Sequence, residues 1–122
     1  MIVTTARTAA WQPAPAARFA GDARSRMFDI PADQTPLTGM TVELTAGSRT
    51  AWHSHPRGQI LIAISGHGQV QTEGGPIITL APGDSIWAEP GERHWHGATP
   101  DSDFVYTSIQ PTDPETGTYA DW

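Results

Sequence analysis

The sequence of 122 residues contains neither cysteine nor lysine, since all seven of its basic residues are arginine. Without cysteine the chain has no disulfide framework, no thiolate metal site and no thiol nucleophile. Without lysine it has no side chain for Schiff-base chemistry. It also lacks any run near the roughly 18 apolar residues of a membrane span, and its first residues do not form a signal peptide. We therefore expect a soluble, cytoplasmic protein.

Positive charge is scarce as well. The seven arginines stand against 13 acidic residues, which gives a formal net charge of -6. Nucleic acids and anionic membranes both require a basic surface on their partner. The charge balance therefore argues against both as partners. At this length we expect one domain with an ordinary hydrophobic core.

Glycine and proline, by contrast, are abundant. Twelve glycines and eleven prolines divide the chain into short pieces, which disfavours long helices and favours short strands joined by turns. Residues 39–44 alternate apolar and polar side chains, as a half-buried strand does. The other expected strands are residues 24–30, 60–64, 69–72, 77–80, 85–88, 93–96 and 104–109, with a turn at 65–68 and a hairpin around Gly74, Gly75 and Pro76. On the last strand, we expect Phe104, Tyr106, Ser108 and Gln110 to share one face. The run at 60–64 is apolar throughout, so we expect it to be covered on both faces. This pattern predicts an all-β sandwich or barrel of the jelly-roll type.

Four of the five histidines fall within two short motifs. His53 and His55 are separated by one residue, and a strand turns alternate side chains toward the same face. If the chain stays extended to Gln59, the amide oxygen of that residue joins them by the same parity. His94, in the second motif, supplies another imidazole from a distant strand. Three imidazoles and one amide oxygen suit a divalent transition metal of the first row.

The two motifs together resemble the cupin signature. Its first half reads Gly-x5-His-x-His-x3-(Glu or Gln)-x6-Gly, and its second half begins with Gly-Asp and ends in Pro-Gly-x-x-His. The matching anchors are Gly47, His53, His55, Gln59 and Gly66, then Gly83, Asp84, Pro90, Gly91 and His94. The resemblance implies a single cupin domain over residues 1–122, folded as a double-stranded β-helix.

Within that domain, residues 39–110 would form the barrel core. Residues 1–38 would be an N-terminal lead-in and oligomerisation segment, and residues 111–122 an acidic C-terminal tail with Tyr119 and Trp122 as docking anchors. Family habit and the apolar content of residues 1–30 predict a homodimer or a higher homo-oligomer.

A narrower resemblance is to small bacterial cupins that include the manganese-dependent hydroxynitrile lyases. It rests on TAWHSHP at 50–56, GGP at 74–76 and ERHWHGATP at 92–100. It implies a metal on His53, His55, Gln59 and His94, and a pocket at Met40, Val42, Thr50, His96, Tyr106 and Gln110. In those lyases the position of Tyr106 is a histidine thought to act in proton transfer. Met40 replaces a small residue, which should narrow the pocket.

Strand parity gives a separate view of the pocket. It places Met40 and Val42 on one consistent face, and Leu61 on the side of Gln59. For Thr50 it predicts the face opposite His53, so Thr50 enters the pocket by the resemblance alone. The expected substrate-binding residues are Met40, Val42, Thr50 and Leu61.

The expected ligand set is electrically neutral, so the +2 charge of a divalent metal would stay uncompensated by the protein. This favours the binding of anions such as cyanide, enolate or carboxylate, and it disfavours oxidation of the metal, which indicates a Lewis-acid role. His96 shares the face of His94 and is the expected acid or base beside the metal. We expect Tyr106 to donate a hydrogen bond or a proton to a developing oxyanion, and Gln110 to orient the substrate.

These residues predict a metal-dependent lyase that acts on a small oxygenated substrate by Lewis-acid and general acid/base catalysis. A hydroxynitrile lyase, which cleaves or forms cyanohydrins, is the most specific expectation. Two alternatives stay open: an Fe(II) cupin dioxygenase, against which Gln59 argues, and a non-catalytic cupin that binds a small ligand. Mn(II) is the favoured metal, and Fe(II), Ni(II), Co(II) and Zn(II) stay open because affinity trends alone do not decide between them.

Overall fold

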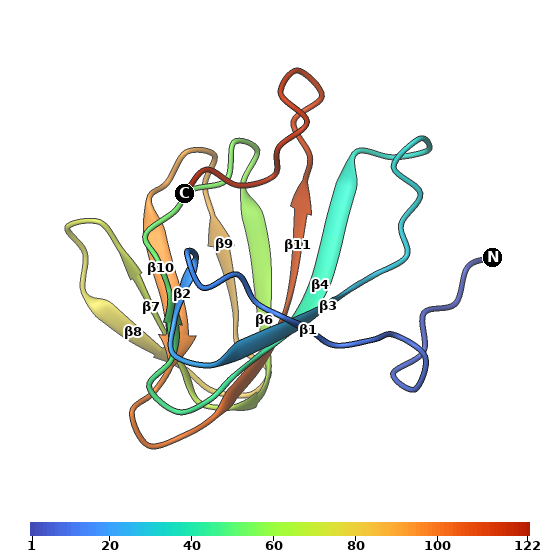
Figure 1. Ribbon diagram of the computed structural model, residues 1–122. Helices are drawn as coiled ribbons and strands as arrows, with labels where there is room; N and C mark the ends of the chain where they lie inside the picture. Colours follow the sequence, from blue (N-terminus) through green and yellow to red (C-terminus); the bar gives the residue numbers. More distant parts are fainter.

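The computed structural model describes residues 1–122, and all of its regular elements are strands. Their bounds are β1 Gln12–Pro13, β2 Phe19–Ala20, β3 Ala23–Met27, β4 Leu37–Leu44, β5 Arg49–Thr50, β6 Gln59–Gly66, β7 Gly68–Thr72, β8 Ile77–Leu80, β9 Ser85–Ala88, β10 His94–Ala98 and β11 Phe104–Pro111. They form a six-stranded sheet, β1-β3-β4-β11-β6-β9, and a five-stranded sheet, β2-β5-β10-β7-β8 (Figure 1). All the pairings are antiparallel. The predicted all-β jelly roll is confirmed.

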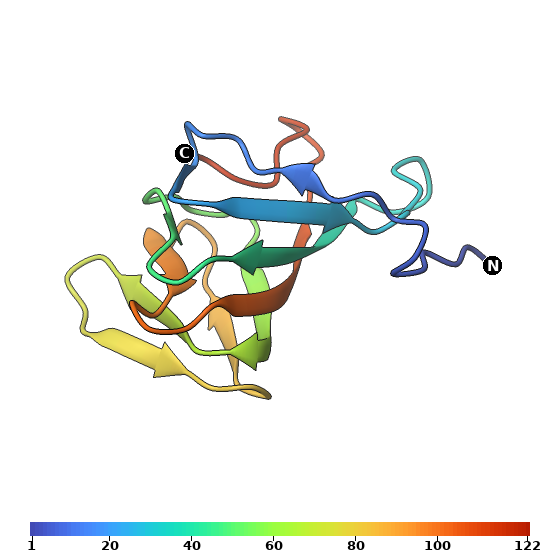
Figure 2. The same cartoon turned by 60° about the horizontal axis from the view of Figure 1, so that its bottom comes forward.

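No helix capable of crossing a membrane is present. Figure 2 shows β1, β3, β4 and β11 as successive bands of the larger sheet, with the first residues of the chain running away from it.

The core lies between the two sheets and follows the alternation of side chains along each strand. On β11 every second residue is buried, from Phe104 through Tyr106 and Ser108 to Gln110. This confirms the shared face predicted for these four residues and shows that it points into the barrel. The apolar core residues are Val42, Leu44, Leu61, Ala63, Val70, Leu80, Ala98, Phe104 and Tyr106.

Three strand predictions need correction. The run at 60–64 is buried only on its inner face, at Leu61 and Ala63, whereas Ile64 is 51% exposed because no layer packs outside the larger sheet at that point. Residues 65–68 are not a turn: β6 continues to Gly66 and β7 starts at Gly68, so the chain changes sheets at a single residue. The strand predicted at 24–30 ends at Met27, because the N–H of Asp29 donates to Thr4 Oγ1 and not to the ladder.

The hairpin predicted around Gly74, Gly75 and Pro76 is confirmed. It joins β7 to β8, which pair in register from Gly68 opposite Leu80 to Gln71 opposite Ile77.

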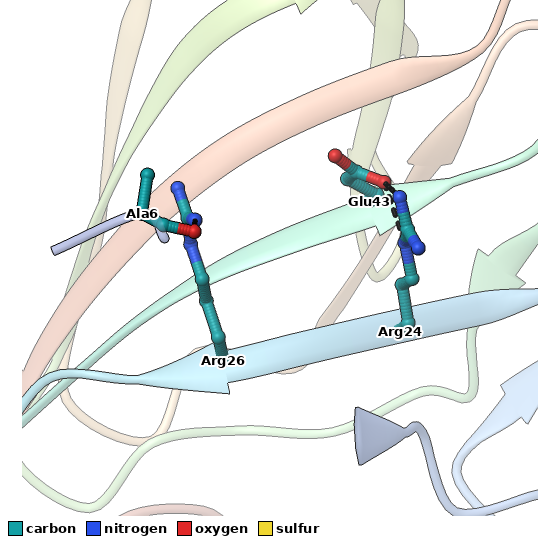
Figure 3. Close-up of polar contacts among 4 residues, drawn as sticks. All are labelled: Ala6, Arg24, Arg26 and Glu43. Carbon is teal, nitrogen blue, oxygen red and sulfur yellow. Dashed lines mark hydrogen bonds and ion pairs between the residues drawn. The ribbon is translucent and has the colours of Figure 1, made fainter. Parts of the chain in front are cut away.

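Arginines on β3 tie the N-terminal segment to the outer face of the larger sheet (Figure 3). Arg24 donates to Glu43 of β4 over 2.7 Å, and Arg26 donates to the carbonyl oxygen of Ala6 over 3.3 Å. Both guanidinium groups also lie over the ring of Trp11, at 4.6 and 4.8 Å from its centroid. These contacts leave the opposite face of β3 turned toward the mouth of the barrel, where Ser25 and Met27 line the pocket described below.

The close approach of β5 and β10 gives a first prediction. Gly97 pairs with Arg49, and a Cβ at position 97 would lie 2.6 Å from the carbonyl oxygen of Ser48 and 2.8 Å from the Cα of Arg49. Because backbone atoms cannot move aside cheaply, we expect Gly97→Ala to lower the free energy of unfolding by about 3 kcal/mol, measured by chemical denaturation.

Gly47→Ala is the control for this variant. Gly47 has φ of 78°, but a Cβ added there would meet no atom within 4 Å, so it tests backbone conformation without a collision. We expect a loss of about 1 kcal/mol there. Equal losses in the two variants would contradict the tight packing of β5 on β10.

Candidate metal centre and its pocket

One end of the barrel interior is polar. Along β11 the inward residues change from Phe104 and Tyr106 to Ser108 and Gln110. On β6 and β10 the polar inward residues come first in the chain, at Gln59 and at His94 and His96, and they lie at this same end of the barrel. The buried polar residues gathered there are Thr50, His53, His55, Gln59, His94, His96, Ser108 and Gln110. Burying polar groups costs free energy unless they find partners. The density of such groups at this end therefore makes it the candidate functional end.

Backbone pairing brings the two histidine motifs together. His53 and His94 exchange both backbone hydrogen bonds, with N–O distances of 2.9 and 2.8 Å, and their ring centroids lie 4.5 Å apart. The ring of His55 lies 5.1 Å from that of His53. The shared face predicted for His53 and His55 therefore brings both rings into one cluster.

Gln59 reaches the cluster by a different route from the one the parity argument assumed. The chain does not stay extended after His55: it turns at Gly58, which has φ of 79° and donates its N–H to the carbonyl of His55 over 3.2 Å. Gln59 is then the first residue of β6, is buried, and lines the same cavity.

Three of the imidazoles are held by backbone carbonyls. The Nδ1–O distances are 2.9 Å from His53 to Ala51, 2.7 Å from His55 to Tyr119 and 2.8 Å from His94 to Glu92. A carbonyl oxygen can only accept, so each Nδ1 carries the proton and each Nε2 keeps its lone pair. Histidines that bind metals are oriented in this way, with the other ring nitrogen donating to a carbonyl or a carboxylate.

The remaining donor atoms fit a metal. His55 Nε2, His94 Nε2 and Gln59 Oε1 are buried without a hydrogen-bond partner in the protein. Gln59 Nε2 donates to Gln110 Oε1 over 3.0 Å, which leaves the other amide atom of Gln59 free. Buried polar atoms nearly always have a partner. Imidazole nitrogens and an amide oxygen left unpaired together match the preference of a divalent first-row metal.

His96 differs from the other three histidines because neither of its ring nitrogens has a partner. Its backbone N–H donates to Thr50 Oγ1 over 3.2 Å, and its ring lies edge-on to Tyr106 with centroids 4.9 Å apart. By proximity alone, His53, His94 and His96 form a triad that could hold a metal ion, since their ligand atoms lie within 4.8 Å of one another. The carbonyl anchors instead favour His55, so two donor sets overlap at His53 and His94.

Burial sets the charge of this cluster. It lowers the pKa of His53 to about 3 and that of His55 to about 4, against the opposing effect of their hydrogen bonds to the carbonyls of Ala51 and Tyr119. Burial also lowers the pKa of His94 and of His96. All four imidazoles are therefore neutral at pH 7, as metal binding requires.

Tyr106 has the opposite shift. Burial raises the pKa of its phenol far above the usual value of 10. The hydroxyl therefore keeps its proton and can only act as a hydrogen-bond donor or acceptor, not as a phenolate base.

A cavity of about 270 Å³ opens onto the cluster. Of the predicted residues it is lined by Met40, Val42, Thr50, His53, His55, Gln59, His96, Tyr106 and Gln110. Leu61 does not line it: its side chain lies deeper, in the hydrophobic core. Thr50 does line it, although parity predicted the opposite face, because β5 ends at Thr50 and two non-strand residues before His53 reset the alternation.

The sequence did not reveal the residues at the mouth of the cavity that come from the N-terminal strands. They are Gln12, Pro13, Pro15, Arg18, Phe19, Ser25 and Met27, and Tyr119 and Trp122 of the tail join them. No Asp or Glu side chain lines the cavity, and Arg18 is the only formally charged side chain in its lining. In a chain with 13 acidic residues, this arrangement makes the pocket suited to an anion or to a neutral oxygen ligand.

Comparison with known proteins gives a consistent set of matches. A family model described as "Cupin domain" matches residues 40–110. A Granulicella tundricola protein named (R)-mandelonitrile lyase is 44% identical over 97 residues, which cover 79% of this chain and 73% of that protein. The structure of a cupin-like protein from Thermotoga maritima is 35% identical, with a TM-score of 0.81, and the match covers 90% of this chain and 82% of that one.

A polyketide cyclase from Streptomyces resistomycificus matches with a TM-score of 0.80 at 16% identity, over 93% of this chain and 80% of that one. At that identity the likeness shows the fold alone.

The lowered pKa values predict how the stability of the metal-free protein depends on pH. Below the ordinary value of 6.5, the unfolded chain protonates His53 and His55 while the folded chain does not, so acid favours unfolding. Stability should therefore fall from about pH 6.5 downward and level off only near the folded pKa values of about 4 and about 3. Denaturant titrations across this range measure the loss.

His53→Gln should reduce this dependence on pH, because it removes a buried imidazole that takes up a proton only when the chain unfolds. A stability that stays flat below pH 6.5 in the unsubstituted protein would contradict the burial of neutral histidines.

A third prediction separates the two donor sets. If the carbonyl anchors define the ligands, His55→Ala should weaken Mn(II) binding by about a hundredfold or more, whereas His96→Ala should change it only slightly. Competition with a chelator of known affinity measures both variants. The reverse ranking would instead select the triad of His53, His94 and His96.

Proposed function

This chain belongs to the cupin family, and on that premise we propose that it is a metal-dependent lyase acting on a small oxygenated substrate, most specifically a hydroxynitrile lyase. The observation that carries the proposal is the charge of the site. The imidazoles of His53, His55 and His94 are neutral at pH 7. The cavity beside them has no Asp or Glu side chain in its lining. The 44% identity to a protein named (R)-mandelonitrile lyase supports the same reaction.

His53, His55, Gln59 and His94 are the residues that would hold the metal. When bound, a divalent metal supplies Lewis-acid chemistry to an oxygen atom or to an anion such as cyanide. Because these four residues carry no negative charge, they would not reduce the +2 charge that makes the metal a Lewis acid. The same neutrality disfavours a higher oxidation state, which is why a lyase is favoured over an oxygen-using enzyme.

His96 is the base for this reaction. Its imidazole is neutral because burial lowers its pKa, it lines the cavity, and neither ring nitrogen is engaged by the protein. It takes the hydroxyl proton of the cyanohydrin as the bond to the nitrile carbon breaks. The electron pair of that bond leaves with cyanide, and the carbinol carbon becomes a carbonyl. His96 then returns the proton to cyanide, so that hydrogen cyanide and an aldehyde result.

Tyr106 and Gln110 act as hydrogen-bond donors to the substrate. Tyr106 keeps its proton at all ordinary pH values, so its hydroxyl is suited to stabilising an oxygen that gains negative charge. Gln110 is fully buried, and its Nε2 has no partner in the protein while its Oε1 accepts from Gln59. The Gln110 amide therefore orients Gln59 through its oxygen and presents its Nε2 group to the cavity.

The size of the cavity sets the substrate class. Its volume of about 270 Å³ lies just below the range of roughly 300–1,000 Å³ found for pockets that bind drug-sized ligands. Met40 and Val42 form an apolar part of its lining. A small cyanohydrin with an apolar substituent is consistent with both features.

The test is the cleavage of mandelonitrile by protein loaded with Mn(II). We expect benzaldehyde release that is lost on chelation of the metal and in His53→Ala. His96→Ala should lower kcat by roughly 100- to 10,000-fold because the base is removed. Tyr106→Phe should lower it by about 100-fold because one donor to the oxygen is removed.

His67→Ala is the matched control, because this histidine is exposed and does not line the cavity, and it should keep full activity. No release from protein shown to contain Mn(II) would contradict the hydroxynitrile-lyase proposal. Oxygen uptake by the Fe(II) form with an enol substrate would instead indicate a dioxygenase, and ligand-induced thermal stabilisation without turnover would indicate a binding protein.

A further inference from the structure

The last residues of the chain return to the functional end of the barrel. After β11 the chain makes a loop and then passes the segment between β5 and β6 (Figure 1). Residues 119–122, named here the C-terminal strap, make three separate contacts with the two histidines of the first motif.

The first contact is a backbone pairing. Asp121 exchanges both backbone hydrogen bonds with Ser54, each with an N–O distance of 2.9 Å. Ser54 stands between His53 and His55, so the strap is fixed directly beside both imidazoles.

The second contact supplies a hydrogen bond that the first motif does not supply for itself. The Nδ1 atoms of His53 and His94 each bond the carbonyl two residues earlier in the chain, at Ala51 and Glu92. For His55 the equivalent carbonyl belongs to His53, and that oxygen already accepts from the backbone N–H of His94. His55 bonds the carbonyl of Tyr119 instead, over 2.7 Å.

The third contact is a ring stack. The indole of Trp122 lies on the imidazole of His53, with centroids 4.4 Å apart and an interplanar angle of 25°. Arg18 and Phe19 pack around the same indole, at 5.2 and 6.2 Å from its centroid. Trp122 also lines the cavity.

We propose that the C-terminal strap is a positioning element of the metal centre. The Tyr119 carbonyl holds His55 in the tautomer that presents Nε2 to the metal, and the Trp122 ring holds the plane of the His53 imidazole. A ligand whose tautomer and orientation are fixed in advance binds more tightly than one that must be ordered on binding. The inference rests on the proposed metal centre but not on the cyanohydrin reaction.

The experiment uses the full chain without metal and with ¹⁵N-labelled histidine, because long-range NMR correlations report which ring nitrogen carries the proton. In the unsubstituted protein, His53, His55 and His94 should all be protonated at Nδ1. Asp121→Pro removes the N–H that pairs with Ser54, and we expect it to release His55 into a mixture of tautomers. His94, whose partner is Glu92, should not change and serves as the internal reference.

Asp121→Ala is the matched control, because it keeps the backbone N–H and should leave His55 protonated at Nδ1. Affinity for Mn(II), measured by competition with a chelator, should fall about 10- to 100-fold in Asp121→Pro. It should also fall in Trp122→Ala and be largely restored in Trp122→Phe, which keeps an aromatic ring on His53.

An unchanged tautomer of His55 in Asp121→Pro, together with unchanged Mn(II) affinity, would overturn the inference. This outcome is distinct from a failure of the proposed function, because the tautomer is read in metal-free protein. A protein with the expected tautomers and Mn(II) affinities but no cyanohydrin cleavage would support the role of the strap and refute the hydroxynitrile-lyase proposal.

Discussion

The hydrogen bond from an imidazole Nδ1 to a backbone carbonyl is the interaction on which the rest of this site depends. Each of three buried histidines makes one. Without it, an N–H group in the barrel would be left unpaired at a cost of about 1–3 kcal/mol, and the lone pair at Nε2 would have no fixed direction. The backbone thus determines which nitrogen faces the cluster. At His53 and His94 the accepting carbonyl lies two residues earlier in the chain. The carbonyl two residues before His55 instead accepts the backbone N–H of His94, and His55 bonds the carbonyl of Tyr119.

The distribution of charge separates the pocket from the rest of the surface. The chain is acidic overall, yet its carboxylates serve in other places: Glu43 pairs with Arg24 outside the sheet, and Asp84 and Asp103 accept backbone N–H groups in turns. None reaches the cavity. The net charge of a protein therefore says little about the electrostatic character of its binding site, which here is governed by neutral imidazoles and by burial.

Local alternation made part of this structure predictable. The shared face of alternate residues on β11 and the shared side of His53 and His55 follow from a period of two residues. The pairing of β7 with β8 follows from the turn residues Gly74, Gly75 and Pro76 between them. The same reasoning failed wherever the backbone left the strand conformation, at the break after Thr50 and at the turn before Gln59. Alternation also does not show how far along the barrel a side chain lies. Leu61 is on the same face as Gln59, but a step of two residues along a strand covers roughly 7 Å, which places Leu61 in the hydrophobic core and not in the cavity. The mouth residues and the strap are long-range contacts that leave no periodic signal.

The division of roles that we propose for the four buried histidines follows from the same hydrogen bonds. An imidazole whose Nδ1–H donates to a carbonyl can bind a metal through the lone pair at Nε2. It cannot transfer the Nδ1 proton without breaking that hydrogen bond. His96 is equally buried and stands beside the same cluster, yet neither nitrogen is committed. It can accept a proton at one nitrogen and release it again at no cost in hydrogen bonds to the protein. The short distances from His96 to His53 and His94 make it a candidate ligand. Because neither of its ring nitrogens is hydrogen-bonded to the protein, it is better suited to proton transfer.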